Sequence, residues 1–399
     1  MEKEKLWTKD FVSASIVNFV LMLSMYLLLV IMATYSMEIY GASVSLAGLV
    51  ASIFVIGSLV GRLYAGRQIT KTGSKKMLIT GIIIFLILTL FYFIPTNIYL
   101  LLLLRFLHGI GVGLATTATG TIVAQVIPPS RNGEGIGYFS MSVVLATAIG
   151  PLIGVGLIGT LGYTSVFLFS LIMGIASLVI ALPLKVPEMA APESTEGEGK
   201  GFKISNFFEL KAVPVSISMF VAAFAYSGIL SFITGYAADI NLVEAGSFYF
   251  LVYAVIILLS RPFTGPLIDR RGGNSVAYPG LVLFAIGMLM ISQATTSWVF
   301  LLAAAIIGLG YGNFQSTSQA IAIKVTPPHR MGLATSTYFI ALDLGLGVGP
   351  FVLGYLVPLS GYRGMYLSLV GLIVVSIIVY YFTHGRKDKA LTRSTTEQA

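Results

Sequence analysis

Long apolar stretches follow one another along the whole chain, separated by short breaks rich in Gly, Pro and charged residues. Most stretches are about 20 residues or longer, the length that an α-helix needs to cross a bilayer. Strands of a membrane barrel would be about 10 residues long and would alternate between apolar and polar positions. The pattern therefore predicts membrane-spanning helices. They are expected at 11–36, 46–67, 76–95, 98–125, 133–160, 163–186, 212–237, 246–267, 275–293, 297–324, 332–358 and 362–384.

Composition supports this prediction and narrows the function. Of 399 residues, 56% are hydrophobic and 10% are charged, whereas a soluble domain carries about 25% charged residues. This deficit argues against a soluble enzyme, a nucleic-acid-binding protein and a disordered chain. The chain has no cysteine, and its three histidines, His108, His329 and His384, are far apart in the sequence. We therefore expect no catalytic residues, no metal site and no cofactor.

The positions of the positive charges predict the orientation. If the N-terminus, MEKEKLWTKD, is a retained cytoplasmic start, nearly all of the 24 Lys and Arg residues fall on the cytoplasmic side. The exceptions are Arg363, which falls outside, and Arg105, which falls within a span. Cytoplasmic loops of membrane proteins carry such an excess of positive charge. We expect a multi-pass protein of the cell membrane with both termini in the cytoplasm.

The chain divides into two halves that resemble each other. A polar break at 187–211 predicts a cytoplasmic linker between a six-helix bundle at 1–186 and a second at 212–384, with a cytoplasmic tail at 385–399. The halves match at a constant offset of 199 residues. The matches are Arg62 with Arg261, the loop Pro128-Pro129-Ser130-Arg131 with Pro327-Pro328-His329-Arg330, and Gly150-Pro151 with Gly349-Pro350. Two parallel six-helix repeats can rock about a site at their interface, which is the geometry of a transporter.

Three motifs carry a resemblance to a known family. The second half contains the cytoplasmic loop motif as Gly265, Asp269, Arg270 and Gly272, and the first half contains it as Gly66, Thr70, Lys71 and Gly73, with Thr70 in place of the acid. Span four has Arg105 followed by His108-Gly109, and span five has Gly150-Pro151 and Gly154 but lacks two glycines of the antiporter signature. The chain resembles the major facilitator superfamily, and most of all its bacterial drug:proton antiporter and small-metabolite exporter branch. This resemblance implies an all-α membrane fold of twelve helices in two pseudo-symmetric bundles, and a monomer.

Two charged residues are predicted to lie within the membrane. Asp343 is about eleven residues into span eleven, near the midplane, where an ionised acid costs about 2.5–3.5 kcal/mol. Since burial favours the protonated form of a carboxyl group, Asp343 is our candidate for a reversible proton carrier. Arg105 is our second candidate for proton coupling. The alternatives are that Asp343 ties helices together through hydrogen bonds and that Arg105 braces the bundle.

The resemblance further implies that spans one, four, seven and ten line the substrate cavity. Tyr311, Gln315 and Gln319 recur at every fourth position of span ten and share one helix face. Aromatic and Met side chains with few fixed charges suit amphipathic ligands. The candidate substrate-binding residues are Asn18, Met22, Met25, Tyr26, Thr117, Phe224, Tyr226, Tyr311, Gln315 and Gln319. The alternative for each is ordinary packing between helices.

The cytoplasmic loop motifs are candidates for a gate. Asp269 should face the N-terminus of span five, near Arg131 and Glu134, where the helix dipole favours an acid. Because the first half lacks this acid at Thr70, we expect an asymmetric gate held mainly by the second-half loop. The gating candidates are Gly66, Lys71, Gly73, Gly265, Asp269, Arg270, Gly272 and Arg131, and the helix-packing candidates are Gly150, Pro151, Gly154, Gly349 and Pro350.

The leading hypothesis is secondary export of a small amphipathic drug or metabolite in exchange for protons, of the kind that gives multidrug resistance by efflux. The proton motive force would supply the energy, because the sequence has no nucleotide-binding motif. The partners would be a small-molecule substrate, protons and lipid, with no nucleic acid. A proton-coupled importer or facilitator of a sugar, nucleoside or organic acid stays open, as does a membrane protein that does not transport, such as a sensor.

Overall fold

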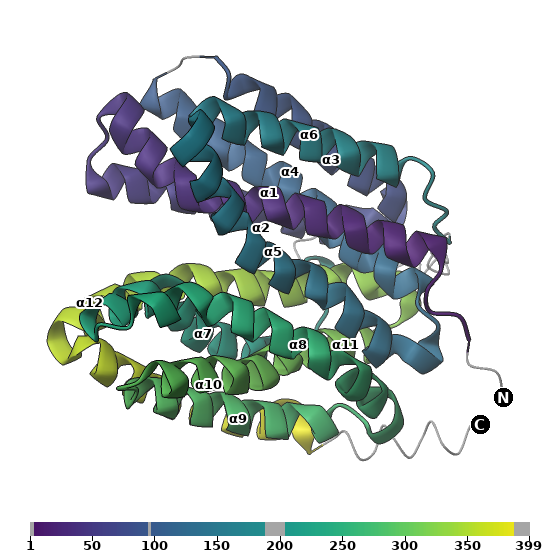
Figure 1. Ribbon diagram of the computed structural model, residues 1–399. Helices are drawn as coiled ribbons and strands as arrows, with labels where there is room; N and C mark the ends of the chain where they lie inside the picture. Colours follow the sequence, from purple (N-terminus) through teal and green to yellow (C-terminus); the bar gives the residue numbers. More distant parts are fainter. Residues whose placement is uncertain (1–3, 95–96, 188–203, 387–399) are drawn as a thin grey trace. The chain divides into compact units, whose positions relative to one another are not determined.

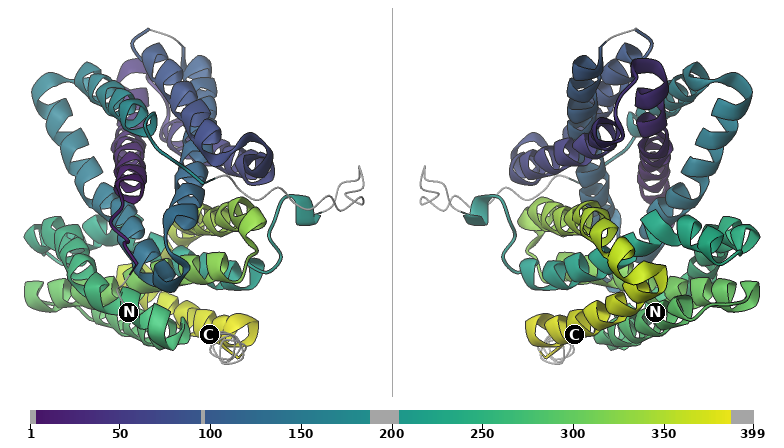
Figure 2. Two further views of the ribbon diagram at one scale, coloured as in Figure 1. Left: turned by 90° about the vertical axis from the view of Figure 1, so that its right-hand side faces the viewer. Right: turned by 90° about the vertical axis from the view of Figure 1, so that its left-hand side faces the viewer.

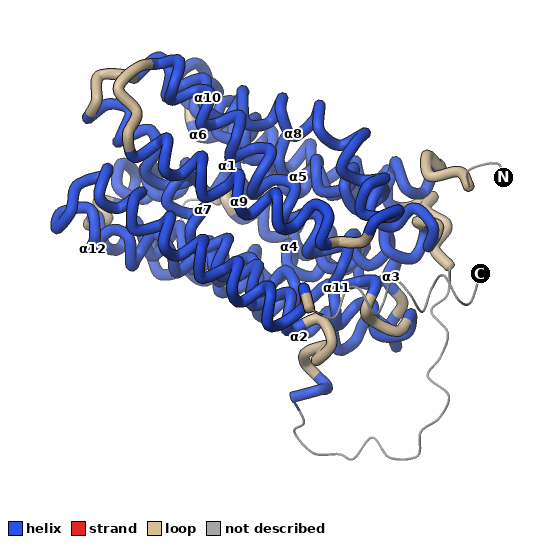
Figure 3. Tube along the Cα trace, turned by 90° about the horizontal axis from the view of Figure 1, so that it is seen from below, coloured by secondary structure: helices blue, strands red, loops and turns tan. Residues whose placement is uncertain are grey.

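The structure is a computed structural model that describes residues 4–94, 97–187 and 204–386, and within them it is helical, with no strand (Figure 3). Residues 188–203 of the predicted linker and 387–399 of the predicted tail lie outside the described residues. The helices are α1 (Lys9–Tyr40), α2 (Val44–Thr72), α3 (Ser74–Phe91), α4 (Ile98–Val126), α5 (Asn132–Leu161), α6 (Tyr163–Ala181), α7 (Val213–Asp239), α8 (Val243–Arg271), α9 (Asn274–Ser292), α10 (Ser297–Ile307), α11 (Asn313–Lys324) and α12 (Met331–Tyr380) (Figure 1).

The helix ends follow local sequence signals. The Thr8 side chain accepts a hydrogen bond from the Phe11 backbone N–H, which caps the start of α1. Helix α1 ends at Gly41, whose φ of 63° lies in the left-handed region that glycine adopts without steric cost. The predicted span 11–36 was therefore too short, because an apolar stretch marks only the part of a helix that lies in lipid.

Eleven stretches are long and apolar enough to cross a membrane in the described part of the chain. One of them, Ser297–Lys324, joins α10 to α11 through a π-helical turn at Gly308–Gly312. The last, Pro328–Gly385, has 58 residues, about twice what one crossing needs. It is broken at Gly361 (φ 67°, ψ 174°), and its two parts are light green and yellow in Figure 2. The all-helical membrane fold is thus confirmed, with both predicted final spans inside this stretch.

The helices gather into two compact units, which do not coincide with the two halves of the sequence. Unit 1 contains the described residues of Met1–Pro128, Ser142–Glu209 and Thr326–Ile340. Unit 2 contains those of Pro129–Met141, Leu210–Val325 and Ala341–Ala399. The start of α5 therefore packs in unit 2 and the start of α12 packs in unit 1. The boundaries predicted from sequence mark the two covalent halves and stay a prediction as functional domains.

Glycines bring helix backbones into direct contact within unit 1. A β-carbon added to Gly109 of α4 would lie 2.0 Å from the Phe54 carbonyl oxygen of α2. One added to Gly57 of α2 would lie 1.9 Å from the Phe106 carbonyl oxygen of α4. Real side chains do not tolerate such distances, so α2 and α4 can pack this closely only because both positions are glycine.

The internal repeat recurs in the packing of each unit. In unit 1, a β-carbon on Gly111 would lie 3.1 Å from the Gly81 carbonyl oxygen. In unit 2, one on Gly310 would lie 2.7 Å from the Gly280 carbonyl oxygen. These two pairs are equivalent at the offset of 199 residues, so corresponding helices use corresponding glycines to approach each other.

The predicted packing glycines also lie against neighbouring helices. In unit 1, a β-carbon on Gly150 would lie 3.1 Å from the Leu23 carbonyl oxygen of α1, and Gly154 faces Ile31 of the same helix. In unit 2, Gly349 faces Ser227 of α7. Pro151 and Pro350 follow Gly150 and Gly349 within α5 and α12.

Candidate functional site

Asp343 lies in α12 within unit 2 and is 9% exposed. It is about twelve residues from the start of the helix, or roughly 18 Å at 1.5 Å per residue, which is consistent with a position deep in the membrane. In the described part of the chain, the only other buried acid is Glu209. Asp343 is therefore the one buried carboxyl group found well inside a membrane-spanning stretch of those residues.

Arg105 lies in α4 within unit 1 and is fully buried. Its Nε donates to the Val50 carbonyl oxygen at 3.2 Å, and its guanidinium carbon lies 4.6 Å from the centre of the Phe54 ring. Its terminal nitrogens make no hydrogen bond of normal geometry with the described residues. Since Arg105 belongs to unit 1 and Asp343 to unit 2, a coupling between them stays a proposal.

His108 lies one helical turn after Arg105 and is fully buried. The Tyr92 hydroxyl lies 3.0 Å from its Nδ1, and the Thr89 hydroxyl lies 3.5 Å from its Nε2. The Phe54 and Phe85 rings pack against the imidazole. This environment is that of a packed, hydrogen-bonded residue.

The substrate-binding candidates of unit 1 include a buried hydrogen-bond network. The Asn18 amide nitrogen of α1 donates to the Ser142 hydroxyl of α5 at 2.7 Å, and its amide oxygen accepts from Thr119 of α4 at 2.8 Å. Thr117 is buried next to this network, and its hydroxyl makes no hydrogen bond. The apolar candidates Met22, Met25 and Tyr26 are also buried.

The candidates of unit 2 centre on stacked tyrosine rings. The rings of Tyr226 and Tyr311 are parallel within 9°, with centroids 4.0 Å apart. The ring of Tyr253 in α8 also stacks with that of Tyr226, with centroids 5.5 Å apart. Gln315 and Gln319 are buried one and two turns beyond Tyr311, and Phe224 is half-buried. Tyr311 lies in the π-helical turn, a distortion that is frequent at functional sites.

Asp269 is near the end of α8, and its side chain lies at the N-terminus of α5 within unit 2. Its carboxylate accepts from the backbone N–H groups of Gly133 at 2.6 Å and Glu134 at 2.9 Å. Arg131 pairs with Glu134, with Nη2 2.7 Å from Oε1. Gly265 is required here because a β-carbon on it would lie 2.7 Å from the Glu134 α-carbon. The other two motif residues of this loop are Arg270, which is exposed, and Gly272, which has a φ of 82°.

Replacing Asp269 by asparagine should destabilise this contact by about 1–2 kcal/mol, because a charge-assisted hydrogen bond and a favourable interaction with the helix dipole are lost. The measurement is thermal unfolding of the detergent-solubilised protein. Asp239→Asn, at the exposed end of α7, is the matched control and should leave the midpoint unchanged. Equal midpoints for Asp269→Asn and the control would contradict the assignment.

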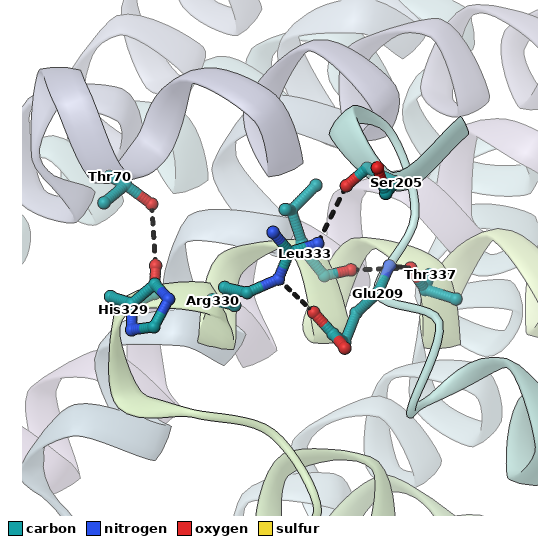
Figure 4. Close-up of polar contacts among 7 residues, drawn as sticks. All are labelled: Thr70, Ser205, Glu209, His329, Arg330, Leu333 and Thr337. Atoms are coloured by element: carbon teal, nitrogen blue, oxygen red, sulfur yellow. Dashed lines mark hydrogen bonds and ion pairs between the residues drawn. The ribbon is translucent and has the colours of Figure 1, made fainter. Parts of the chain in front are cut away.

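The equivalent loop in unit 1 is built differently (Figure 4). The Thr70 hydroxyl donates to the His329 carbonyl oxygen at 3.0 Å, and Arg330 pairs with Glu209. The motif glycine Gly66 lies against Ser336. A β-carbon added to Gly66 would be 2.6 Å from the Ser336 β-carbon. The other two motif residues of this loop are Lys71, which is exposed, and Gly73, which has a φ of 87°. A carboxylate thus takes part in both loops, whereas the sequence predicted one in the second half alone.

Comparison with known proteins places this arrangement in a family. The family description Major Facilitator Superfamily matches residues 14–279 and, again, 215–398. The chain belongs to the major facilitator superfamily. It is 28% identical over 374 residues to the MFS-type transporter MJ1560 of Methanocaldococcus jannaschii, covering 92% of this chain and 96% of that protein. It is 26% identical over 377 residues to the MFS-type transporter YhhS of Escherichia coli K12, covering 92% and 91%.

Solved structures of the superfamily share this fold. The transporter FucP, in the outward conformation, has a TM-score of 0.75 at 16% identity, covering 95% of this chain and 99% of that one. The human organic anion transporter MFSD10 has a TM-score of 0.74 at 15% identity, covering 93% and 98%. Members of the superfamily carry small molecules across membranes and typically work as monomers. This multi-pass protein is therefore a transporter of that superfamily.

Two buried arginines that our sequence analysis did not propose as site residues occupy equivalent positions in this superfamily fold. Arg261 donates to Asn313, Ser316 and the Gly312 carbonyl oxygen, and also to the Ser140 hydroxyl at 2.9 Å. Ser140 belongs to the start of α5, so Arg261 joins that segment to the rest of unit 2.

The equivalent residue of unit 1 makes an equivalent connection. Arg62 donates to the Thr116 hydroxyl at 3.1 Å and lies 4.7 Å from the centre of the Phe339 ring. Phe339, in the start of α12, matches Ser140 at the repeat offset. The signal was present in the sequence, since the repeat pairs Arg62 with Arg261, but the pairing alone does not show what the side chains contact.

Proposed function

We propose that this transporter is a secondary exporter that moves a small amphipathic compound out of the cell in exchange for protons. The observation that carries the proposal is Asp343, a buried carboxyl group within a membrane-spanning stretch. Holding its charge there costs about 2.5–3.5 kcal/mol. A carboxyl group can bind and release a proton, which suits a carrier of protons between the two sides of a membrane.

Arg105 is proposed to act with Asp343 in coupling. Its guanidinium keeps its charge at all physiological pH values, and its fully buried terminal nitrogens leave capacity for a further hydrogen-bond acceptor. A group that needs an acceptor in one state of a transport cycle can favour the state that provides one. This role requires Arg105 to respond to proton release by Asp343.

The candidate lining residues support an amphipathic substrate. Tyr226 and Tyr311 offer large ring surfaces, and Met22 and Met25 offer flexible, polarizable side chains that adapt to different ligand shapes. Export as the direction is proposed from the resemblance to the exporter branch, of whose span-five signature the chain keeps Gly150-Pro151 and Gly154 but lacks two glycines. An inward direction would instead favour an importer of a sugar, nucleoside or organic acid.

The experiment compares Asp343→Asn with the parent in proteoliposomes. Ethidium, a fluorescent amphipathic cation, is the first probe. A susceptibility and accumulation screen of cells with and without the protein identifies further probes. With an imposed proton gradient, the parent should move the probe against the proton flux. Asp343→Asn should lower this gradient-driven rate at least about tenfold and should keep downhill exchange of the probe.

Asp239→Asn is the control, because Asp239 lies at the exposed end of α7. It should transport like the parent. Unchanged gradient-driven transport by Asp343→Asn would overturn the coupling role. Probe flux in the same direction as protons would overturn antiport in favour of import, and binding without flux would favour a sensor.

A further inference from the structure

A short segment at the end of the linker, residues 204–209, is bound to the rest of unit 1. We call it the linker strap. The Phe207 ring lies 4.9 Å from the guanidinium carbon of Arg67 at the end of α2. The Ser205 carbonyl oxygen accepts from Arg330 at 2.8 Å, and the Glu209 backbone N–H donates to the Thr337 hydroxyl at 2.9 Å (Figure 4). The strap thus contacts both α2 and the start of α12.

The side chain of Glu209 forms the central contact of the linker strap. Its carboxylate pairs with Arg330, and the Glu209 side chain is 5% exposed while that of Arg330 is 28% exposed. The Thr337 hydroxyl that accepts from the Glu209 backbone also donates to the Leu333 carbonyl oxygen at 2.7 Å. A carboxylate this buried is tolerated because it pairs with the charged Arg330 side chain. The hydrogen bond from the Glu209 backbone to Thr337 holds the residue in place for this pair.

The repeat explains why a carboxylate is needed from the linker. In unit 2, Asp269 binds the first N–H groups of α5, and Arg131 pairs with Glu134. At the offset of 199 residues, Asp269 corresponds to Thr70 and Glu134 to Leu333. Both acids are therefore absent from the corresponding loop of unit 1.

Arg330 corresponds to Arg131 and keeps its charge, so its loop has a cation without either of the acids found in unit 2. Glu209 supplies the carboxylate from elsewhere in the chain, 121 residues away from Arg330. The two loops that are related by the repeat therefore both pair their arginine with a glutamate, and the glutamate comes from a different part of the chain in each.

We propose that Glu209 and the linker strap hold the start of α12 against α2, and so act as the cytoplasmic latch of the first half of the sequence. The contact between Glu209 and Arg330 must break before this segment can move. The end of the linker therefore takes part in gating. The proposal rests on the alternating access of the proposed function, but not on its substrate, direction or proton coupling.

The test measures access to the start of α12 without any substrate. Because the chain has no cysteine, Thr335→Cys provides a single reactive thiol. Thr335 is fully buried and its hydroxyl makes no hydrogen bond, so the change is mild. Inside-out membrane vesicles are treated with a membrane-impermeant maleimide, which reaches the thiol from the cytoplasmic side when the latch opens.

Glu209→Gln in this background should raise the labelling rate about tenfold, because the pair that favours the closed arrangement is lost. Adding Leu333→Glu, which gives Arg330 a partner within its own segment at the Arg131–Glu134 spacing, should not return the rate, because the contact between Arg330 and the linker strap stays lost. The charge exchange Glu209→Arg with Arg330→Glu restores that contact and should return the rate to within about twofold of the parent. Glu244→Gln, an exposed acid in the first turn of α8, is the matched control and should leave the rate unchanged.

An unchanged rate in Glu209→Gln overturns the proposal. So does faster labelling that the charge exchange does not reverse, because general loosening of the fold would behave in that way. Gel filtration of each variant separates unfolding from opening. Gradient-driven transport by Asp343→Asn tests the proton coupling, and labelling of the Glu209→Gln variant tests the latch, so the two failures give different results.

Discussion

Gly109→Ala is expected to destabilise the protein by about 3 kcal/mol or more, because the new β-carbon would lie 2.0 Å from the Phe54 carbonyl oxygen. The obstacle is backbone, which cannot rotate away as a side chain can. Helices α2 and α4 would have to separate, and the contacts along their whole length would loosen. Thermal unfolding in detergent should show a midpoint lower by about 5 °C or more.

Gly156→Ala is the matched control, since Gly156 is also within a helix but a β-carbon there meets nothing within 4 Å. Alanine has the higher helix propensity, so this control should be neutral or slightly stabilising. Gly310→Ala in unit 2 should resemble Gly109→Ala, because its β-carbon would lie 2.5 Å from the Phe284 nitrogen. Equal midpoints for Gly109→Ala and Gly156→Ala would contradict the close approach of α2 and α4.

Arg261→Met is expected to cost about 3 kcal/mol or more of stability, because several buried acceptors lose their donor and each unsatisfied group costs about 1–3 kcal/mol. The substitution leaves Asn313, Ser316 and Ser140 without the donor that they share, inside the protein where water does not replace it. The start of α5 would lose the hydrogen bond that its Ser140 hydroxyl accepts from Arg261. Thermal unfolding and expression level are the measurements.

Arg270→Met is the control for this prediction, since Arg270 is exposed at the end of the same helix. It should unfold at the parent temperature. Arg261→Lys keeps the charge but loses the planar fork of donors, so an intermediate midpoint is expected. If Arg261→Met were as stable as Arg270→Met, the network would have no energetic role.

The sequence was sufficient to predict the helical membrane fold and the repeat. The twelve apolar stretches are long and continuous. In lipid, such stretches can satisfy their backbone hydrogen bonds only as helices. The helix ends were less accurate, because they depend on single residues such as Gly41, whose left-handed φ ends α1 four residues beyond the apolar stretch. The π-helical turn around Tyr311 was not predicted, because its sequence is compatible with a regular helix.

The candidate site was predicted in part. Asp343, Arg105 and Asp269 stand out because charge within an apolar stretch, or in a repeated loop motif, is conspicuous. Glu209 was missed for the opposite reason, since it lies in a polar break that also holds several other charges. Its partner Arg330 is distant in the sequence, and only the folded chain brings the two together.

The exchange of helix starts between the units has a consequence for how the protein can be divided. A fragment that ends at residue 186 would lack Thr326–Ile340, which covers Gly66 and Gly120 in unit 1, and would expose the buried guanidinium of Arg62. A fragment starting at residue 212 would lack Pro129–Met141, the hydrogen-bonding partner of Asp269 and Arg261. Neither polypeptide is self-sufficient, so the two should be stable only when they are synthesised together.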